Sequence, residues 1–340
     1  MPAQTSDVPP HLQVLNLATA SWMSAAVSAA ADLGVADHLG SGPRTVTELA
    51  AAIGAHEPTL YRLLRACADF DLFREHEGRV FESTELGDAL RTDSPNSMRN
   101  FARWVSTPAD RWTWSGLAET VRTGTPAFAK IHGTEIWDHF NAHDETGTVF
   151  DDAMTELSRQ VIAEVVTTYD FTPFATIADI GGGHGTLLTE ILKAAPGTRG
   201  VLFDRPEVIE GAGEVFDASG VRDRVELVSG DFFEAVPSGA DALVLSNIIH
   251  DWDDEQSVRI LTHCERALAP GGRVLLVEAT LPDGTEPAPL VKLVDLDMLV
   301  LSGGSQRTAA EFDGLFQRSG LKLARVVSGG LCSVVEAVRA

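Results

Sequence analysis

The sequence has few cysteines and few basic residues, and both shortages exclude classes of protein. Its three cysteines, Cys67, Cys264 and Cys332, lie far apart and form no CxxC pair. They predict neither a disulfide framework nor a zinc site, and we expect reduced, mostly buried thiols in a cytoplasmic protein. Lys and Arg total 26 against 49 Asp and Glu, a formal net charge of −23. This excess of acid argues against nucleic acid or an anionic membrane as the main partner.

Long hydrophobic runs are also missing. The longest run of small apolar residues, around Trp22–Ala31, is about half of the roughly 20 residues that a transmembrane helix needs. The first basic residue is Arg44, so no charged segment typical of a signal peptide precedes this run. We expect no membrane span and no signal peptide. With 44% hydrophobic and 22% charged residues over 340 positions, the chain has the composition of a globular protein of about two domains.

The N-terminal third carries helical patterns and one short hairpin. Pro9–Leu39 is rich in alanine and apolar on more than one side, which favours a helix buried against another chain or domain. Thr45–Glu48 has the spacing of a capping box, and a second helix follows Pro58. Glu77-Gly78 marks a tight turn between two strands. Two helices followed by a hairpin are typical of a winged helix.

A winged helix can bind DNA or can serve as a structural or dimerisation module. Residues 1–100 contain seven arginines, no lysine and 13 acidic residues, a net charge of −6. In the second helix, His56–Asp69, two acids balance two arginines. Because a DNA-reading helix needs a basic stripe, the composition favours a dimerisation module.

From Thr176 onward, short apolar runs alternate with helical stretches, which indicates an α/β domain with a mostly parallel sheet. Between the two regions, residues 101–165 are helical and rich in aromatic side chains, which could line a pocket for an aromatic ligand or pack helices together. The expected strands are Ile177–Ile180, Gly200–Phe203, Val225–Val228, Ala242–Ser246, Val274–Glu278, Leu321–Val327 and Ser333–Val338.

A glycine-rich loop follows the first of these strands. Ala178–Thr186 precedes a helix from Leu187, so a ligand could approach the backbone beside helix amides. The spacing fails the G-x-G-x-x-G pattern, which favours a nucleoside ligand without a pyrophosphate. Asp204 ends the next strand, where a carboxylate can accept from both ribose hydroxyls or cap the strand end. Asp231 and Phe232 follow the third strand and could hold an adenine base.

A second polar group follows the fourth and fifth strands. His250 lies just after the fourth strand, at the sheet edge where ligands bind in open α/β folds. Glu278 ends the fifth strand, and a carboxylate there needs a partner to be buried. We expect Glu278 to pair with His250, fixing the imidazole tautomer and stabilising its charged form. Asp253 is interpreted as the N-cap of the following helix.

Two clusters of possible ligands do not fit metal patterns. The acids of residues 251–255 lack the glycine and the distal glutamate of a calcium loop. His139 and His143 stand at i and i+4, but Phe140 occupies the glutamate position of the H-E-x-x-H zinc motif. We therefore expect no metal and interpret both histidines as residues of a helix surface.

Several motifs together resemble the S-adenosylmethionine-dependent O-methyltransferases that act on small molecules, of the caffeate, isoflavone and acetylserotonin type, with bacterial relatives in antibiotic tailoring. The resemblance covers nearly the whole chain. Many methyltransferases share the glycine loop, whereas the His-Asp-Trp segment and the later Gly-Gly-x-x-Arg-Thr segment are more specific to this family. The motifs are Gly133-x-x-x-Trp137, Asp179–Gly185, Asp204, Asp231-Phe232, His250–Trp252, Glu278 and Gly303–Thr308.

The resemblance implies an α/β fold: a Rossmann-like class I methyltransferase domain with an N-terminal, mostly helical, winged-helix-like dimerisation domain. We expect residues 1–105 to form the dimerisation domain, residues 106–164 a helical connector lining the substrate pocket, and residues 165–340 the catalytic domain that binds S-adenosylmethionine. It also implies a homodimer that pairs through the N-terminal helices.

The resemblance further implies the parts of the cofactor site. Gly181 and Gly183 would approach the methionine part, Asp204 the ribose, and Asp231 with Phe232 the adenine. Further cofactor-binding candidates are Asp179, Ser158, Ser246 and Trp252.

The catalytic residues follow the same resemblance with one departure. His250 resembles the family's general base, Glu278 resembles one of its two orienting acids, and Asp251 lies beside them. The second acid normally stands in Gly-Gly-x-Glu-Arg-Thr, where this chain has Gln306, which can accept a hydrogen bond but carries no charge. Candidates for contact with the acceptor are Trp104, Trp112, Met154, Asn247, Met298 and Leu301.

These features predict an enzyme that transfers a methyl group from S-adenosylmethionine to a hydroxyl, most simply a phenol, of a small aromatic or polyketide-type metabolite, by direct displacement and without a metal. One alternative is transfer to nitrogen or carbon by the same fold. A second is a family relative that has lost methyl transfer and performs hydroxylation or decarboxylation, for which Gln306 is the one hint. A third, a DNA-binding regulator, is disfavoured by the charge of residues 1–100.

Overall fold

The computed structural model describes residues 8–340. The chain divides into two compact units, which are described one at a time. The first comprises the residues up to Trp112 together with Trp137–Arg159, and the second comprises Thr113–Ile136 together with Gln160–Ala340. Three helices cross from one unit into the other: α8 (Pro108–Ser115), α11 (Ile136–Ala142) and α12 (Asp144–Thr168).

The first unit packs short helices around a three-stranded antiparallel sheet of order β1-β3-β2. The Thr45 hydroxyl accepts from the Glu48 amide, and Glu48 accepts from the Thr45 amide, so the predicted capping box is present. The elements are α1 (Pro10–Ala18), α2 (Ala20–Asp32), α3 (Val35–Leu39), β1 (Arg44–Thr45), α4 (Val46–Ile53), α5 (Glu57–Ala68), β2 (Phe73–His76), β3 (Val80–Ser83), α6 (Glu85–Asp88) and α7 (Arg99–Trp104).

The N-terminal helices are unusually apolar on their surface. Leu17 and Trp22 are 77% and 73% exposed within the single chain. Pro10–Asp32 is the one helical segment of residues 8–340 that is long and apolar enough to cross a membrane by length and composition. This corrects the expectation that no stretch reaches that length: two apolar helices join at Thr19, and the sequence interpretation counted only part of the second. Length and composition alone do not distinguish a membrane span from a surface that packs on protein.

The second unit is built on a seven-stranded sheet of order β6-β5-β4-β7-β8-β10-β9. Neighbouring strands from β6 to β8 pair in parallel, while β10 pairs antiparallel with both β8 and β9. The strands are β4 (Thr176–Ile180), β5 (Arg199–Asp204), β6 (Val225–Ser229), β7 (Ala242–Ser246), β8 (Arg273–Glu278), β9 (Leu321–Ser328) and β10 (Ser333–Arg339). The predicted strands are confirmed to within one or two residues.

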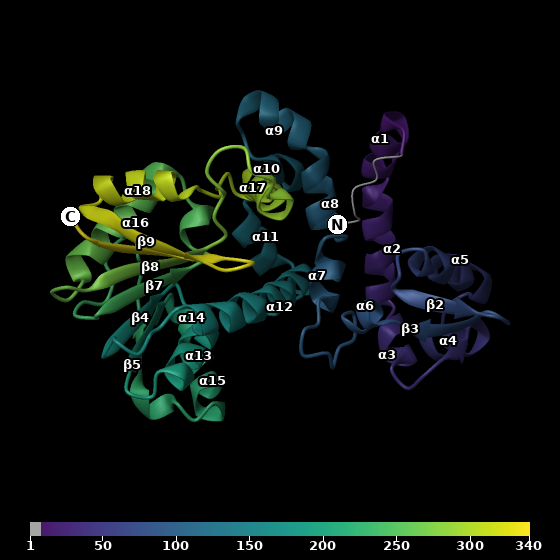
Figure 1. The fold of residues 1–340 in the computed structure, drawn as a ribbon, viewed down its shortest axis with the longest axis horizontal. Coiled ribbons are helices and arrows are strands. Elements are labelled where there is room, and N and C mark those ends of the chain that lie inside the picture. Colours follow the sequence, from purple (N-terminus) through teal and green to yellow (C-terminus); the bar gives the residue numbers. More distant parts are fainter. Residues whose placement is uncertain (1–7) are drawn as a thin grey trace. The chain divides into compact units, whose positions relative to one another are not determined.

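Helices cover both faces of this sheet (Figure 1). Successive strand residues point to opposite faces. Ile177 therefore packs with α13 and α15, whereas Ala178 packs with α16 and α18. The helices are α9 (Leu117–Thr123), α10 (Ala127–His132), α13 (Thr186–Ala194), α14 (Pro206–Ile209), α15 (Ala212–Ala218), α16 (Asp254–Ala267), α17 (Pro289–Leu301) and α18 (Ala309–Arg318), with 3-10 turns η1 (Arg222–Arg224) and η2 (Ile249–Asp251).

The order of the strands reverses between β4 and β7, because β5 and β6 extend to one side of β4 and β7 and β8 to the other. Ligands of open α/β sheets bind beyond the carboxyl ends of the strands at such a reversal. The predicted glycine loop follows β4 and His250 follows β7, so both lie at this reversal.

Candidate active site

The loop after β4 adopts backbone conformations that favour glycine. Gly181, Gly183 and Gly185 have φ angles of +69°, +60° and +81°, a region that other residues adopt at a cost. The Gly183 amide donates to Asp204 Oδ2 at 2.8 Å. A Cβ at Gly183 would meet no heavy atom within 4 Å. The backbone at Gly183 is therefore open to a ligand.

The acids that follow β5 and β6, Asp204 and Asp231, can accept further hydrogen bonds beside this loop. Asp204 accepts from the Gly183 amide on one oxygen and from the Arg205 amide on the other, at 2.7 Å. Asp231 is exposed and accepts from the Phe233 amide at 2.7 Å. A carboxylate oxygen can accept more than one hydrogen bond, so both acids can still receive hydroxyl or amine donors.

The loops after β4, β6 and β7 meet. A Cβ at Gly181 would lie 2.6 Å from Ile248 Cδ1 and 3.6 Å from the ring of Phe232. The Phe232 ring packs edge-on against Trp252, with centroids 6.0 Å apart. The open glycine, the two acids and an aromatic ring thus lie at one sheet edge, which fits a nucleoside ligand.

Asp179 lies in β4 beneath the glycine loop. It is 1% exposed, and neither carboxyl oxygen has a hydrogen-bond partner among residues 8–340. Burial raises the pKa of Asp179 to about 7, the nearby Asp204 carboxylate adds to the rise, and the backbone amide of Leu188, outside hydrogen-bond geometry, opposes it. A Cβ at Gly182 would fall 2.6 Å from the Asp179 carboxyl. The loop therefore packs directly on an acid whose protonated form is favoured by burial.

His250 lies in η2, directly after β7. Its Nδ1 is 3.2 Å from Glu278 Oε2, and its Nε2 is 3.6 Å from Asp251 Oδ1. The Glu278 side chain is 0% exposed, and its Oε1 accepts from the Ile249 amide at 2.9 Å. The His250 side chain is 15% exposed. The structure thus brings together the imidazole and the strand-end acid that the sequence singles out.

Opposing influences set the pKa of His250. Burial is the largest single influence and lowers it, but the Glu278 carboxylate, by charge and by hydrogen bonding, and Asp251 together raise it by more. The positive charge of Arg307 lowers the pKa of His250. The net result of all these influences is a pKa raised to about 9. Burial also raises the pKa of Asp251 to about 6, against the opposing charge of His250.

Gln306 approaches the same ring nitrogen. Its Nε2 lies 3.0 Å from His250 Nδ1, and it is 3% exposed. Its backbone amide donates to Asp295 Oδ1 on α17 at 2.8 Å. One ring nitrogen carries at most one hydrogen, so a protonated Nδ1 donates to Glu278 while an unprotonated Nδ1 accepts from Gln306.

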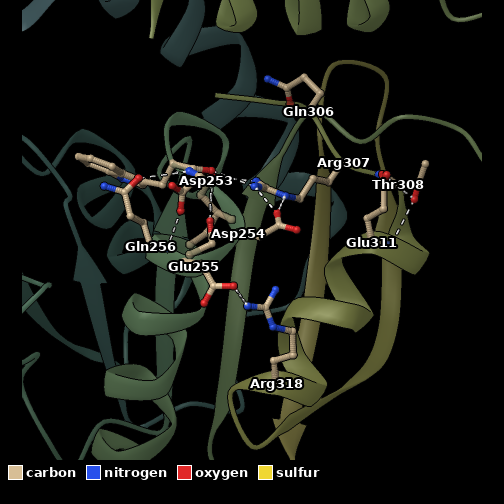
Figure 2. A network of polar contacts seen from close by, with 12 residues as sticks. Asp253, Asp254, Glu255, Gln256, Gln306, Arg307, Thr308, Glu311 and Arg318 are labelled. Carbon is tan, nitrogen blue, oxygen red and sulfur yellow. Dashed lines mark hydrogen bonds and ion pairs between the residues drawn. The ribbon is translucent and has the colours of Figure 1, made fainter. Parts of the chain in front are cut away.

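Arg307 is a site residue that the sequence interpretation treated only as part of a motif. It is 4% exposed and donates to the carbonyls of Ile249 and Trp252, each at 2.9 Å. It also pairs with Asp254 Oδ1 at 2.9 Å, and Figure 2 shows its guanidinium directed at that carboxylate. A buried arginine must have partners, but the sequence alone does not indicate which.

Asp297 on α17 was also missed. It accepts from the Trp114 indole Nε1 at 2.8 Å. Burial raises the pKa of Asp297 to about 6, while that hydrogen bond lowers it. A charged residue within an apolar helical stretch was the available signal.

The other predicted residues are distributed over both units. Asn247 has a φ of +53° immediately before η2, Ser246 ends β7, and Leu301 is 5% exposed at the end of α17. Met298 is half-buried on the same helix. Trp104, Trp112, Met154 and Ser158 belong to the first unit, where Trp104 is 2% exposed and packs edge-on against Phe140 and Phe150.

No metal cluster is found in the part of the chain that the structure describes: it contains no group of three or more His, Cys, Asp or Glu side chains placed to hold an ion. The rings of His139 and His143 stack with centroids 4.1 Å apart.

Comparisons with known proteins agree with this architecture. Residues 114–322 match the O-methyltransferase domain, and residues 15–93 match the O-methyltransferase dimerisation domain. Phenazine O-methyltransferase from Lysobacter antibioticus is 42% identical over 332 residues, covering 97% of this chain and 96% of the relative. The crystal structure of LaPhzM matches with a TM-score of 0.91 at 41% identity, covering 98% of this chain and all of that one.

The relatives include enzymes that methylate nitrogen. The 8-amino-8-demethylriboflavin N,N-dimethyltransferase of Streptomyces davaonensis is 38% identical, covering 91% of this chain and 89% of the relative. The O-methyltransferase NcsB1 from neocarzinostatin biosynthesis, solved with S-adenosylmethionine and 2-hydroxy-5-methyl naphthoic acid, matches with a TM-score of 0.79 at 33% identity, covering 94% and 96% of the two chains. The predicted fold and enzyme class are confirmed. This chain therefore belongs to the O-methyltransferase family, with a catalytic domain preceded by the family's dimerisation domain.

Proposed function

We propose that this protein transfers a methyl group from S-adenosylmethionine to a hydroxyl, most simply a phenol, of a small aromatic or polyketide-type metabolite, with His250 as the general base. The supporting observation is the pairing of a nearly enclosed imidazole with a fully buried carboxylate, Glu278, at the sheet edge that carries the open glycine loop. The naphthoic acid bound to NcsB1 and the phenazine relative support an aromatic acceptor.

The proposed cofactor site consists of an open stretch of backbone and of carboxylates that can accept further hydrogen bonds. The open backbone at Gly183, with Gly181 beside it, fits the methionine part, and Asp204 has acceptor capacity for ribose hydroxyls. Asp231 and Phe232 fit an adenine. Bound S-adenosylmethionine would supply a methyl group activated by the positive sulfonium. Further contacts are proposed at Asp179, Ser158, Ser246 and Trp252.

The base acts by holding and moving one proton. A phenol has a pKa near 10, and the neighbouring acids raise the pKa of His250 to about 9, so the deprotonated imidazole is a base nearly matched to the acceptor. Glu278 stabilises the imidazolium that forms, and Asp251 and Gln306 orient the ring. Such proton transfer contributes about 10²–10⁴-fold to the rate. No metal takes part in the proposed reaction.

The acceptor contacts and the assembly complete the proposal. We place the acceptor against the candidates named for it from the sequence: Trp104, Trp112, Met154, Asn247, Met298 and Leu301. We propose a homodimer that works in the cytoplasm. The homodimer is supported by the dimerisation match over residues 15–93 and by the exposed apolar side chains of α1 and α2, because a large bare apolar surface marks an interface. Light scattering should show twice the monomer mass at micromolar concentration, and a monomer would contradict the proposal.

Calorimetry tests the cofactor. S-adenosylmethionine and S-adenosylhomocysteine should each bind with micromolar affinity, and Asp204→Ala should abolish binding because the ribose loses its acceptor. Failure of both ligands to bind the unchanged protein would overturn the cofactor assignment.

Methyl transfer tests the reaction. The probes are 3-amino-4-hydroxybenzoate, 1,4-dihydroxy-2-naphthoic acid and 2-hydroxy-5-methyl naphthoic acid, which are compounds named for relatives, with methyl-labelled S-adenosylmethionine. We expect labelled ether products and a loss of about 10²–10⁴-fold in kcat on His250→Ala. A full rate with His250→Ala, or label only on nitrogen, would favour N-methyl transfer, which the riboflavin-type relative performs.

A further inference from the structure

The turn that carries His250 depends on bonds from outside itself. It is a 3-10 turn of three residues, and its internal bonds are long: the amides of Asp251 and Trp252 reach the carbonyls of Ile248 and Ile249 at 3.3 Å each. Short 3-10 turns have poor hydrogen-bond geometry. The position of the imidazole therefore rests on what holds this backbone in place.

One side of the turn is held by the neighbouring strand β8. The amide of Ile249 donates to Glu278 Oε1 at 2.9 Å, and the amide of Asn247 donates to the Val277 carbonyl at 3.0 Å. These bonds satisfy amides. The buried Ser257 hydroxyl on α16 approaches two carbonyls of this segment, those of Ile249 at 3.5 Å and Trp252 at 3.3 Å.

The carbonyls are held from the other side by residues 305–307. The Ser305 amide donates to the His250 carbonyl at 2.8 Å. The Arg307 guanidinium donates to the carbonyl of Ile249 through Nη1 and to that of Trp252 through Nη2, at 2.9 Å each. Arg307 thus holds the carbonyls on both sides of His250 with one rigid group.

The charge of Arg307 is compensated at the surface. The Asp254 side chain is 62% exposed, and its Oδ1 accepts from both Nε and Nη2 of Arg307. A planar guanidinium presents its donors in a fixed fork, which a lysine ammonium cannot reproduce. A lysine here would keep the ion pair with Asp254 but would lack the fork that spans both carbonyls at 2.9 Å.

We infer that Arg307 is a positioning residue for methyl transfer, whose guanidinium fixes the turn that places His250 against the acceptor. The inference rests on the proposed role of His250 as the base. A displacement of about 1 Å from the productive geometry can cost about 10²-fold in rate, so a turn that shifts should lower kcat while the cofactor still binds.

Arg307→Lys tests the inference because it keeps the positive charge and removes the fork. The acceptor for this test is whichever phenolic probe the unchanged enzyme methylates fastest. We expect kcat to fall by about 10–100-fold, while the KM for S-adenosylmethionine changes less than about twofold. Hydrogen–deuterium exchange is measured in protein saturated with S-adenosylhomocysteine. The amides of residues 247–253 should exchange at least about tenfold faster in the variant, because hydrogen bonds to a charged group are lost.

Arg318→Gln is the matched control. Arg318 also joins the C-terminal segment to α16, through Glu255 at 2.5 Å, but it touches no part of the turn (Figure 2). This variant should keep the kcat and the exchange of residues 247–253. Equal losses in both variants would show a general weakening of the fold and overturn the inference.

Asp254→Ala keeps the test decisive if Arg307→Lys does not fold. It releases the guanidinium without removing it, so we expect a smaller loss of kcat, about two- to fivefold, and faster exchange in residues 247–253. Unchanged kcat in every folded variant that loosens Arg307 would overturn the inference. Retained activity in Arg307→Lys beside an inactive His250→Ala refutes the positioning role alone, whereas a fully active His250→Ala refutes the proposed base.

Discussion

Two buried carboxylates in one sheet, Asp179 and Glu278, differ in their partners and in the proton equilibria that they influence. Asp179 on β4 and Glu278 on β8 are 1% and 0% exposed. Asp179 has no hydrogen-bond partner among the described residues, and burial raises its pKa to about 7. Glu278 has the Ile249 amide and the His250 imidazole as partners, and together with Asp251 it raises the pKa of that imidazole to about 9. Burial favours the protonated form of Asp179, whereas Glu278 is buried beside an imidazole and favours the protonated form of that base.

Among the substitutions that test this comparison, Glu278→Gln should have the largest effect on activity. Without the carboxylate, the imidazolium loses its principal support, and kcat/KM should fall by about 10²–10⁴-fold. The pH profile of kcat/KM checks the cause: in the unchanged enzyme its acidic limb should lie near the His250 pKa of about 9, and in the variant it should move to lower pH.

Glu336→Gln is the control for that experiment. Glu336 on β10 is also 0% exposed, but its partners are Arg273, Arg325 and the Tyr169 hydroxyl. This variant should lose stability and keep the acidic limb. A limb that moves equally in both variants would contradict the assignment to Glu278.

Asp179→Asn should change stability with pH. Because the folded pKa of Asp179 lies above that of the unfolded chain, its stabilising proton is fully present below pH 4 or so and is lost as the pH rises to about 7. An asparagine cannot ionise, so the variant should gain a few kcal/mol relative to the unchanged protein between pH 5 and pH 8. Urea unfolding of both proteins at the two pH values measures this. An equal difference at both values would show that Asp179 is ionised throughout.

Gln306→Glu should have the smallest effect. It places a second carboxylate beside His250 Nδ1, where Gln306 Nε2 now lies at 3.0 Å. An added negative charge favours the imidazolium, so the acidic limb should move up by about one pH unit while the rate at high pH changes little. An unmoved limb would show that Glu278 alone sets the proton affinity of the ring.

The features predictable from sequence are those fixed by local spacing. The capping boxes at Thr45 and Asp253 are present, and the strands lie where the apolar runs predict. The contact of His250 with Glu278 was also predictable, because carboxyl ends of adjacent parallel strands share one edge. The family resemblance extended these observations to an enzyme class that the comparisons confirm.

The features that escaped prediction depend on contacts between distant segments. Arg307 meets the carbonyl of Ile249, 58 residues earlier, and Trp114 meets Asp297, 183 residues later. The hydrophobic periodicity of a sequence gives no indication of which side chain donates a hydrogen bond to a distant backbone carbonyl. The break between α1 and α2 at Thr19 was missed because the apolar pattern continues across it.

The central claim is that Glu278 holds the proton on His250. Titrating the His250 imidazole by NMR, assigned with His250→Asn, tests this directly and needs no acceptor. We predict a pKa of about 9 in the unchanged protein and a fall of at least about one unit in Glu278→Gln. A pKa near the ordinary 6.5 in the unchanged protein, or the same value in both proteins, would contradict the account.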